Sequence, residues 1–150
     1  MASTLTPNKK HIAIILAVCF LIADRLAKIL ALFNFKKIIL NNFLSFELNR
    51  NFDLALSLVL GFNPLWLVLP IILILIFWII IYYKKNKTLS TVLLFIVLGA
   101  VSNLYDRLVY GYVIDYFNLA SINVFNVADL MIVGGALKLF YDEYLSSAKK

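Results

Sequence analysis

The residues that most often build metal sites and nucleophilic triads are scarce in this sequence, whose 150 residues include one cysteine and one histidine. Because Cys19 is alone, an internal disulfide and a cysteine-ligated metal site are excluded. His11 is equally alone, which argues against a histidine metal site or a histidine-based triad. Any chemistry is therefore expected from carboxylates and the polar groups around them.

Charged residues are also few, at 15% of the chain against 63% hydrophobic residues, and the mean hydropathy is +0.94. A soluble domain is about a quarter charged and about half apolar. The excess apolar surface has to face something other than water, and lipid is the obvious candidate. The net charge of +6 comes from cations dispersed between hydrophobic blocks, which is typical of loops beside anionic lipid and not of a nucleic-acid groove. The length suits a single domain, residues 1–150.

Four hydrophobic blocks predict four transmembrane helices, at about residues 11–33, 64–83, 89–105 and 127–145. Each is near the roughly 20 residues that cross a bilayer core. Lysines at positions 9, 10, 84, 85, 87, 149 and 150 all fall on one side of this arrangement, and the positive-inside rule makes that side cytoplasmic. Lys36 and Lys37, on the other side, are the exception. We expect a multi-pass, membrane α-helical fold with both termini in the cytoplasm.

Residues 43–60 have a different pattern. From Leu44 to Leu58 the even positions are apolar except Arg50, and the odd positions are mostly polar. A period of two predicts extended β structure with one apolar face, and the alternative is a folded loop packed on the helices. Because an open sheet edge is not tolerated in the hydrocarbon core, we place this segment at the external membrane surface. Arg50 should then reach a polar partner.

Two groups of polar residues stand out against this apolar background. Asp24 and Lys28 are spaced i,i+4 in the first span, which predicts either a structural ion pair or a pair that orients a substrate or loop. Asn103, Asp106 and Arg107 share a helix face near the end of the third span. The plainer interpretation of the second group is a helix C-terminus with Asp106 and Arg107 as a surface pair.

Asp115 and Asp129 carry the prediction of chemistry. Asn126 stands three residues before Asp129, a capping-box spacing that explains the second aspartate without catalysis. Capping does not explain Asp115, which lies in the apolar run from Val113 to Phe117. Two adjacent carboxyls can share one proton, so that one activates a water molecule and the other donates a proton, with no cofactor. A helix dipole at Asp129 would favour its ionised form and leave Asp115 as the protonated partner.

Two other classes of function compete with hydrolysis. Buried acids in a small helical bundle can handle protons or cations in a transporter component, which predicts acids spread through the membrane depth. Here they gather toward one face, and this distribution favours a surface-facing site. A non-enzymatic assembly or anchoring protein would leave Asp115 unexplained.

Five motifs across nearly the whole chain resemble bacterial lipoprotein signal peptidase, the type II signal peptidase. They are Asp24-Arg25-Leu26-Ala27-Lys28; Arg50-Asn51 followed by Ala55 and Ser57; Gly99, Asn103, Asp106 and Arg107; Gly111, Val113 and Asp115; and Phe125-Asn126-Val127-Ala128-Asp129. The last two are specific when they occur together and in this order.

The resemblance implies an intramembrane aspartyl endopeptidase of the bacterial cytoplasmic (inner) membrane, with its active site near the extracytoplasmic face. Such an enzyme removes signal peptides from prolipoproteins, cleaving on the amino side of a diacylglyceryl-modified cysteine, and it uses no cofactor or metal. It is a target of globomycin-like inhibitors, and it carries a small extracytoplasmic β-cradle that suits the period-two segment. The implied catalytic pair is Asp115 and Asp129. The implied substrate-binding or dyad-supporting residues are Asp24, Lys28, Asn51, Asn103, Asp106, Arg107 and Asn126.

The chain departs from the family pattern at several positions. Asp53 stands where glycine is usual, Leu56 where phenylalanine is usual, Ala27 where serine or threonine is usual, and Tyr116 where phenylalanine is usual. These changes leave both aspartates in place, so activity is expected. They bear on how substrate is held, and Asp53 adds negative charge near the site.

Overall fold

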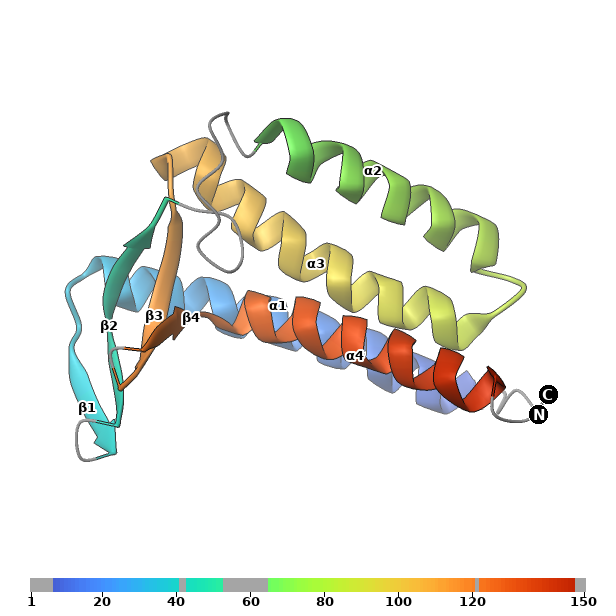
Figure 1. The fold of residues 1–150 in the computed structure, drawn as a ribbon, viewed down its shortest axis with the longest axis horizontal. Helices are drawn as coiled ribbons and strands as arrows, with labels where there is room; N and C mark the ends of the chain where they lie inside the picture. The colour runs from blue at the N-terminus through green and yellow to red at the C-terminus, as the bar shows by residue number, and fades with distance from the viewer. Residues whose placement is uncertain (1–6, 41–42, 53–64, 121, 148–150) are drawn as a thin grey trace.

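The fold is that of a computed structural model, which describes residues 7–40, 43–52, 65–120 and 122–147. Its elements are the helices α1 (Pro7–Leu32), α2 (Leu65–Tyr82), α3 (Lys87–Tyr110) and α4 (Val127–Ser147), and the strands β1 (Lys37–Leu40), β2 (Leu44–Asn51), β3 (Val113–Leu119) and β4 (Asn123–Phe125). The helices form an elongated bundle, and the strands form a small sheet at one end of it (Figure 1). This mostly helical architecture with a small antiparallel sheet agrees with the expected fold class.

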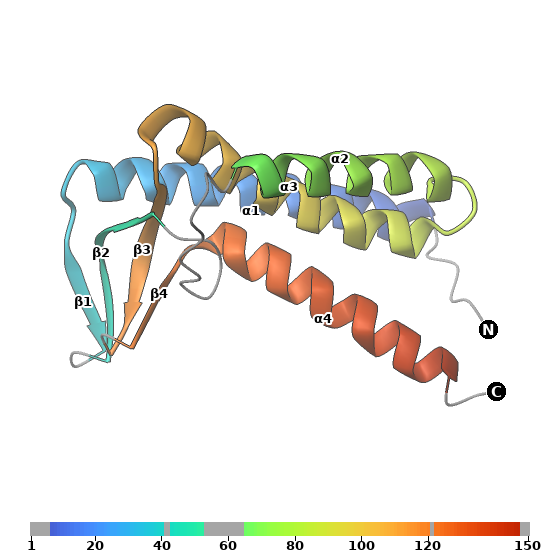
Figure 2. The same ribbon diagram turned by 45° about the horizontal axis from the view of Figure 1, so that its top comes forward.

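Helix α3 is the centre of the bundle, because α1, α2 and α4 all pack against it. Figure 2 shows α2 beside α3 and α4 diverging from the other helices toward its C-terminus. Glycine permits a close contact between α3 and α4. A Cβ atom on Gly99 would lie 2.5 Å from the carbonyl oxygen of Ala128, at the start of α4. The glycine therefore lets α3 approach the first turn of α4, where Asp129 lies.

The four expected spans correspond to the four helices, with shifts at their ends. By length and hydropathy, two helices of the described residues suit a membrane span, α2 and α3. The other two are long enough, at 26 and 21 residues, but they carry more charge: α1 holds Asp24, Arg25 and Lys28, and α4 holds several acidic residues and Lys138. The number of spanning helices therefore stays a prediction.

The helix α3 extends beyond the third expected span, which was placed at about residues 89–105. The helix α3 continues past residue 105 to Tyr110, and Gly111 ends it in the left-handed conformation with φ 81°. The N–H of Gly111 donates to the carbonyl oxygen of Arg107 at 3.1 Å, which closes the last turn. Asn103 and Asp106 therefore lie inside the helix, and Arg107 lies in its last turn.

The period-two segment is a strand in its described part. Leu44–Asn51 forms β2, and residues 53–60 of the expected 43–60 segment, with Asp53 and Leu56, lie outside the described residues. The antiparallel order is β1-β2-β3-β4. Phe46 and Leu48 of the apolar face pack on a core of Ala31 from α1 and Ile114 and Tyr116 from β3. Residues 113–119 and 123–125, which lie between the third and fourth expected spans, form strands that complete this sheet.

A register shift in β2 determines what faces Asp115. Phe46 pairs with Phe117, so an unbroken ladder would place Leu48 opposite Asp115. The register shifts between Phe46 and Asn49, and Asn49 pairs with Asp115 instead. The irregularity thus gives Asp115 polar neighbours on β2. Within the described residues, the contact of the Arg50 guanidinium is with the Tyr112 ring, 5.4 Å from the centroid, and not with the expected polar partner.

Candidate functional site

Asp115 lies in the middle of β3 with a fully buried side chain and two amide donors. The side-chain amide of Asn51 donates to its Oδ2 at 2.8 Å, and that of Asn126 donates to its Oδ1 at 2.6 Å. Both amides hydrogen-bond the carboxylate as acceptor, which favours its charged form, whereas burial opposes that form. The strand positions the carboxyl group, and the two amides fix its orientation.

Asp129 lies in the first turn of α4 and closes a capping box with Asn126. The Asp129 N–H donates to Asn126 Oδ1 at 2.8 Å, and the Asn126 N–H donates to Asp129 Oδ2 at 3.1 Å. These reciprocal bonds confirm the predicted cap. The other carboxylate oxygen, Oδ1, accepts from the Asn103 amide at 2.8 Å. Asp129 therefore serves the helix start and remains held beside α3.

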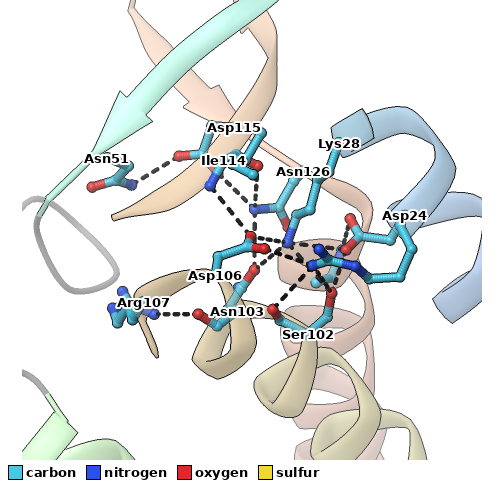
Figure 3. A network of polar contacts seen from close by, with 12 residues as sticks. Asp24, Lys28, Asn51, Ser102, Asn103, Asp106, Arg107, Ile114, Asp115 and Asn126 are labelled. Atoms are coloured by element: carbon cyan, nitrogen blue, oxygen red, sulfur yellow. Dashed lines mark hydrogen bonds and ion pairs between the residues drawn. The ribbon is translucent and has the colours of Figure 1, made fainter. Parts of the chain in front are cut away.

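Asn126 connects the two aspartates. Its amide nitrogen donates to Asp115 while its amide oxygen and backbone N–H bond to Asp129. The same amide nitrogen lies 3.2 Å from Asn103 Oδ1, so the two asparagines are also linked to each other. Figure 3 shows Asn103 and Asn126 near the centre of the polar network. Side chains from α3, β3 and the start of α4 thus converge around one pair of carboxyls.

Lys28 of α1 provides the buried positive charge behind this pair. Its Nζ lies 3.0 Å from Asp24 Oδ2 and 2.7 Å from Asp106 Oδ2, and all three side chains are 0% exposed. The predicted Asp24–Lys28 ion pair is therefore confirmed, and Asp106 extends it to α3. Lys28 also donates to Asn103 Oδ1 at 2.9 Å. Because the ammonium has donors only, it holds the amide oxygen of Asn103 toward itself and turns the amide nitrogen to Asp129.

Asp106 is not part of a surface pair with Arg107, as the plainer interpretation had it. Besides Lys28, it binds Arg25 Nη1 at 2.6 Å and accepts the Ile114 N–H at 3.3 Å. Its burial against two cations follows from the continuation of α3 beyond the predicted end. Arg107 donates instead to the carbonyl oxygen of Asn103, at 3.5 Å, and points away from Asp106's partners (Figure 3).

Sequence reasoning did not select three residues of this network: Arg25, Ser102 and Tyr116. Ser102 donates to Asp24 Oδ2 at 2.6 Å, and Arg25 also stacks over Tyr105, 4.6 Å from the ring centroid. Arg25 carried a signal, since it is a charge inside a predicted span. Tyr116 was noted as a departure from the family pattern, whereas Ser102, a serine in an apolar helix, gave no signal.

The network is closed on one side and open on the other. On the side of α1, Asp24, Lys28 and Asp106 are fully buried. Asn51, Arg107 and Asp129 are partly exposed. Figure 3 shows Asn51 and Arg107 on the side of the network away from Asp24. All nine residues selected from the sequence therefore belong to one connected network. Among the described residues, Asn51 and Arg107 are partly exposed members of the network, so polar substrate groups can approach it from their side.

Burial raises the pKa of the Asp115 carboxyl to about 6, and the charge of Asp129 adds to this rise. Hydrogen bonds from Asn51 and Asn126 oppose it. A carboxyl with such a pKa can hold a proton near neutral pH while its partner is ionised, which is the state that general acid–base catalysis by a carboxyl pair requires. Within the described ranges, no group of three or more His, Cys, Asp or Glu side chains is placed to hold a metal ion.

Comparison with known proteins gives a consistent result. The family described as signal peptidase (SPase) II matches residues 16–145. A lipoprotein signal peptidase of Clostridium acetobutylicum is 34% identical over 144 residues, covering 87% of this chain and 92% of that protein. Another, from Caldicellulosiruptor bescii, is 36% identical over 103 residues, or 69% of each chain.

Two solved structures of bacterial membrane enzymes share the fold. One has a TM-score of 0.79 at 20% identity and covers 93% of this chain and 92% of its own. The other has a TM-score of 0.71 at 19% identity and covers 95% and 96%. The described helices and sheet are therefore arranged as in a known membrane enzyme.

We predict that Lys28→Met destabilises the fold by about 3–5 kcal/mol, because it leaves two buried carboxylates without their shared cation. The free energy of unfolding in detergent would measure this. Lys138→Met is the matched control: it breaks the exposed Lys138–Asp142 pair and should cost no more than about 1 kcal/mol. Equal losses in the two variants would contradict a structural role for the buried ammonium.

Proposed function

This chain belongs to the signal peptidase II family, and on that premise we propose that Asp115 and Asp129 are its catalytic pair. Its function is the removal of signal peptides from prolipoproteins by aspartic-type proteolysis. The observation that supports the assignment is Asn126, whose side-chain amide donates to the Asp115 carboxyl while its backbone N–H donates to the Asp129 carboxyl. The cleaved bond lies on the amino side of the diacylglyceryl-modified cysteine.

The two carboxyls have different roles because one is ionised and the other is protonated. The ionised carboxyl takes a proton from a water molecule, whose oxygen attacks the scissile carbonyl carbon. The protonated carboxyl donates to the developing oxyanion. A proton then passes to the leaving nitrogen, the carbon–nitrogen bond breaks, and a new carboxylate and a free amine result. The raised pKa of Asp115 supports its role as the initially protonated partner, with the proton shared between both groups in the free enzyme.

The supporting residues act from the two sides of the pair. Asn103 and Asn126 hold the carboxyls, and Lys28 holds Asn103. Asp24 and Asp106 balance the charge of Lys28 on the buried side. On the open side, Asn51 and Arg107 are placed to hold the backbone of the substrate beside the scissile bond. A role in proton or cation transport is not supported, since the family and the relatives are signal peptidases.

The membrane arrangement extends this proposal. Helices α1 to α4 all cross the bacterial inner membrane, both termini lie in the cytoplasm, and the sheet with the catalytic pair lies at the extracytoplasmic face. Two features support it. The sheet, whose strand β3 carries Asp115, lies at one end of the bundle, and the turn between α2 and α3 lies at the other (Figure 1). That turn is basic, with Lys84 and Lys85, and Lys87 follows at the start of α3.

Thiol labelling would test this orientation. In a Cys19→Ser background, Lys37→Cys should react with a membrane-impermeant maleimide on intact spheroplasts. Lys85→Cys should react only after the membrane is permeabilised. The reverse pattern, or equal labelling of both variants from outside, would disprove the proposed orientation.

Replacing either member of the pair should abolish cleavage. We expect Asp115→Asn and Asp129→Asn, made separately, to lower kcat by about 10²–10⁴-fold, the usual range for loss of a general acid or base. Cleavage of a diacylglyceryl-modified prolipoprotein by the purified enzyme in detergent is the measurement. Asp142→Asn removes an exposed carboxylate of α4 and should retain full activity. Wild-type rates in either dyad variant would refute the mechanism.

The pH profile should report the environment of Asp115. Because the protonated carboxyl is the acid, kcat/KM should fall as pH rises through its pKa of about 6 in the free enzyme. The Asn51 amide stabilises the carboxylate, so Asn51→Ala should raise this pKa and move the descending limb to higher pH. Asn49→Ala is the control, because Asn49 donates to the carbonyl oxygen of Glu47 and should leave the limb in place. A limb unmoved in both variants would count against Asp115 as the acid.

A further inference from the structure

Tyr116 is buried beside the catalytic pair and carries a hydroxyl that no step of the proposed cleavage uses. Its side chain is 0% exposed, and its ring lies beside Phe46 and Phe117, with centroids 5.2 and 5.0 Å away. A phenylalanine ring could make the same apolar contacts. Burying a hydroxyl costs free energy unless it is hydrogen-bonded, so the oxygen needs its own explanation.

The hydroxyl connects two elements that lie far apart in the sequence. It donates to Asp24 Oδ1 at 3.0 Å and accepts the Val127 N–H at 2.9 Å. Burial and the Asp24 carboxylate raise the pKa of the Tyr116 phenol, so the hydroxyl keeps its proton and remains a donor throughout the working pH range. The strand β3 is thereby joined to α1 on one side and to α4 on the other.

The same contacts determine where α4 begins. The first four N–H groups of a helix have no partner within it. In α4, Asn126 receives the third and fourth, through its Oδ1 at 2.8 Å and its carbonyl oxygen at 3.4 Å. The first is bound by Tyr116, and the second, from Ala128, by Asp24 Oδ1 at 3.1 Å. Half of the helix start is therefore satisfied by other elements, through a tyrosine and an aspartate that contact each other.

We propose that Tyr116 is a positioning residue that fixes Asp129 relative to Asp115. The proposal rests on the assignment of these aspartates as the catalytic pair. Tyr116 directly follows Asp115 in β3, and Val127 precedes Asp129 by two residues in α4. A hydrogen bond between the hydroxyl and the Val127 N–H therefore ties the strand that carries one carboxyl to the helix turn that carries the other. Asp24 anchors this link to α1.

Without the hydroxyl, the start of α4 has more freedom to move away from β3. The carboxyls would then spend less time in the arrangement that shares Asn126 and a proton. Two measurable effects follow. The rate of the chemical step falls while substrate binding on the open side is unchanged. The charge of Asp129 also raises the pKa of Asp115 less, because it lies farther away on average.

The test is Tyr116→Phe in the full-length enzyme in detergent, with a diacylglyceryl-modified prolipoprotein as substrate. We expect kcat to fall about tenfold, as for loss of one buried hydrogen bond, with KM within about twofold of wild type. The descending limb of the pH profile should move to lower pH, opposite to the shift in Asn51→Ala. Tyr112→Phe, which removes a hydroxyl from a ring beside Arg50 and Phe52, should change neither quantity.

A lower melting temperature of Tyr116→Phe with unchanged kcat and an unmoved pH limb would overturn the proposal, because it would show a structural role alone.

A double-mutant cycle with Asp24→Asn tests the hydrogen bond between the Tyr116 hydroxyl and Asp24. If the hydroxyl acts through Asp24, its loss should lower kcat much less in the Asp24→Asn background than in wild type. The same tenfold loss in both backgrounds would also overturn it.

These outcomes are separable from the fate of the proposed function. Activity retained by Asp115→Asn or Asp129→Asn would remove the catalytic pair itself, whatever Tyr116→Phe does. A different result would remove only the positioning role. In that case both dyad variants lose activity, which supports the catalytic pair, while Tyr116→Phe keeps the kcat and pH profile of the wild type.

Discussion

The structure depends on one buried ammonium. Lys28 is fully enclosed and contacts the carboxylates of Asp24 and Asp106, one from its own helix and one from α3. A charge taken out of water is stable only when paired and hydrogen-bonded, so these groups bind α1 to α3 in a single arrangement. Lys28 also donates to the side-chain oxygen of Asn103, so the amide nitrogen of Asn103 faces Asp129. The buried ammonium thereby fixes the orientation of a residue in the site.

Side-chain amides then fix the orientation of the two aspartates. The described donors to both carboxyls are the asparagines 51, 103 and 126, whose hydrogen bonds favour the ionised forms. Burial and the mutual repulsion of the two groups favour a proton instead. The balance between these effects suits a pair that holds one proton for two carboxyls, which is what cofactor-free peptide hydrolysis by aspartates needs.

The two sides of the aspartate pair differ in burial. The side of α1 is sealed by ion pairs and by the Tyr116 ring, so water and substrate are kept from it. The side of Asn51 and Arg107 is partly exposed. The partly exposed side is therefore the one from which a prolipoprotein substrate is proposed to approach. The sheet is part of both sides, since β2 supplies Asn51 and β3 supplies Asp115 and Tyr116.

The sequence by itself determined what depends on local spacing. The i,i+4 pair of Asp24 and Lys28, the cap between Asn126 and Asp129, and the alternation along 44–51 were readable because each involves residues close in the chain. The two aspartates stood out because polar residues are rare here. The tertiary structure alone decided the rest. Asp106 joins Lys28 across two helices, and β3 becomes a strand only by pairing with β2, whose register shift brings Asn49 opposite Asp115. Tyr116 reaches Asp24 across 92 positions of sequence, a contact that no local pattern encodes.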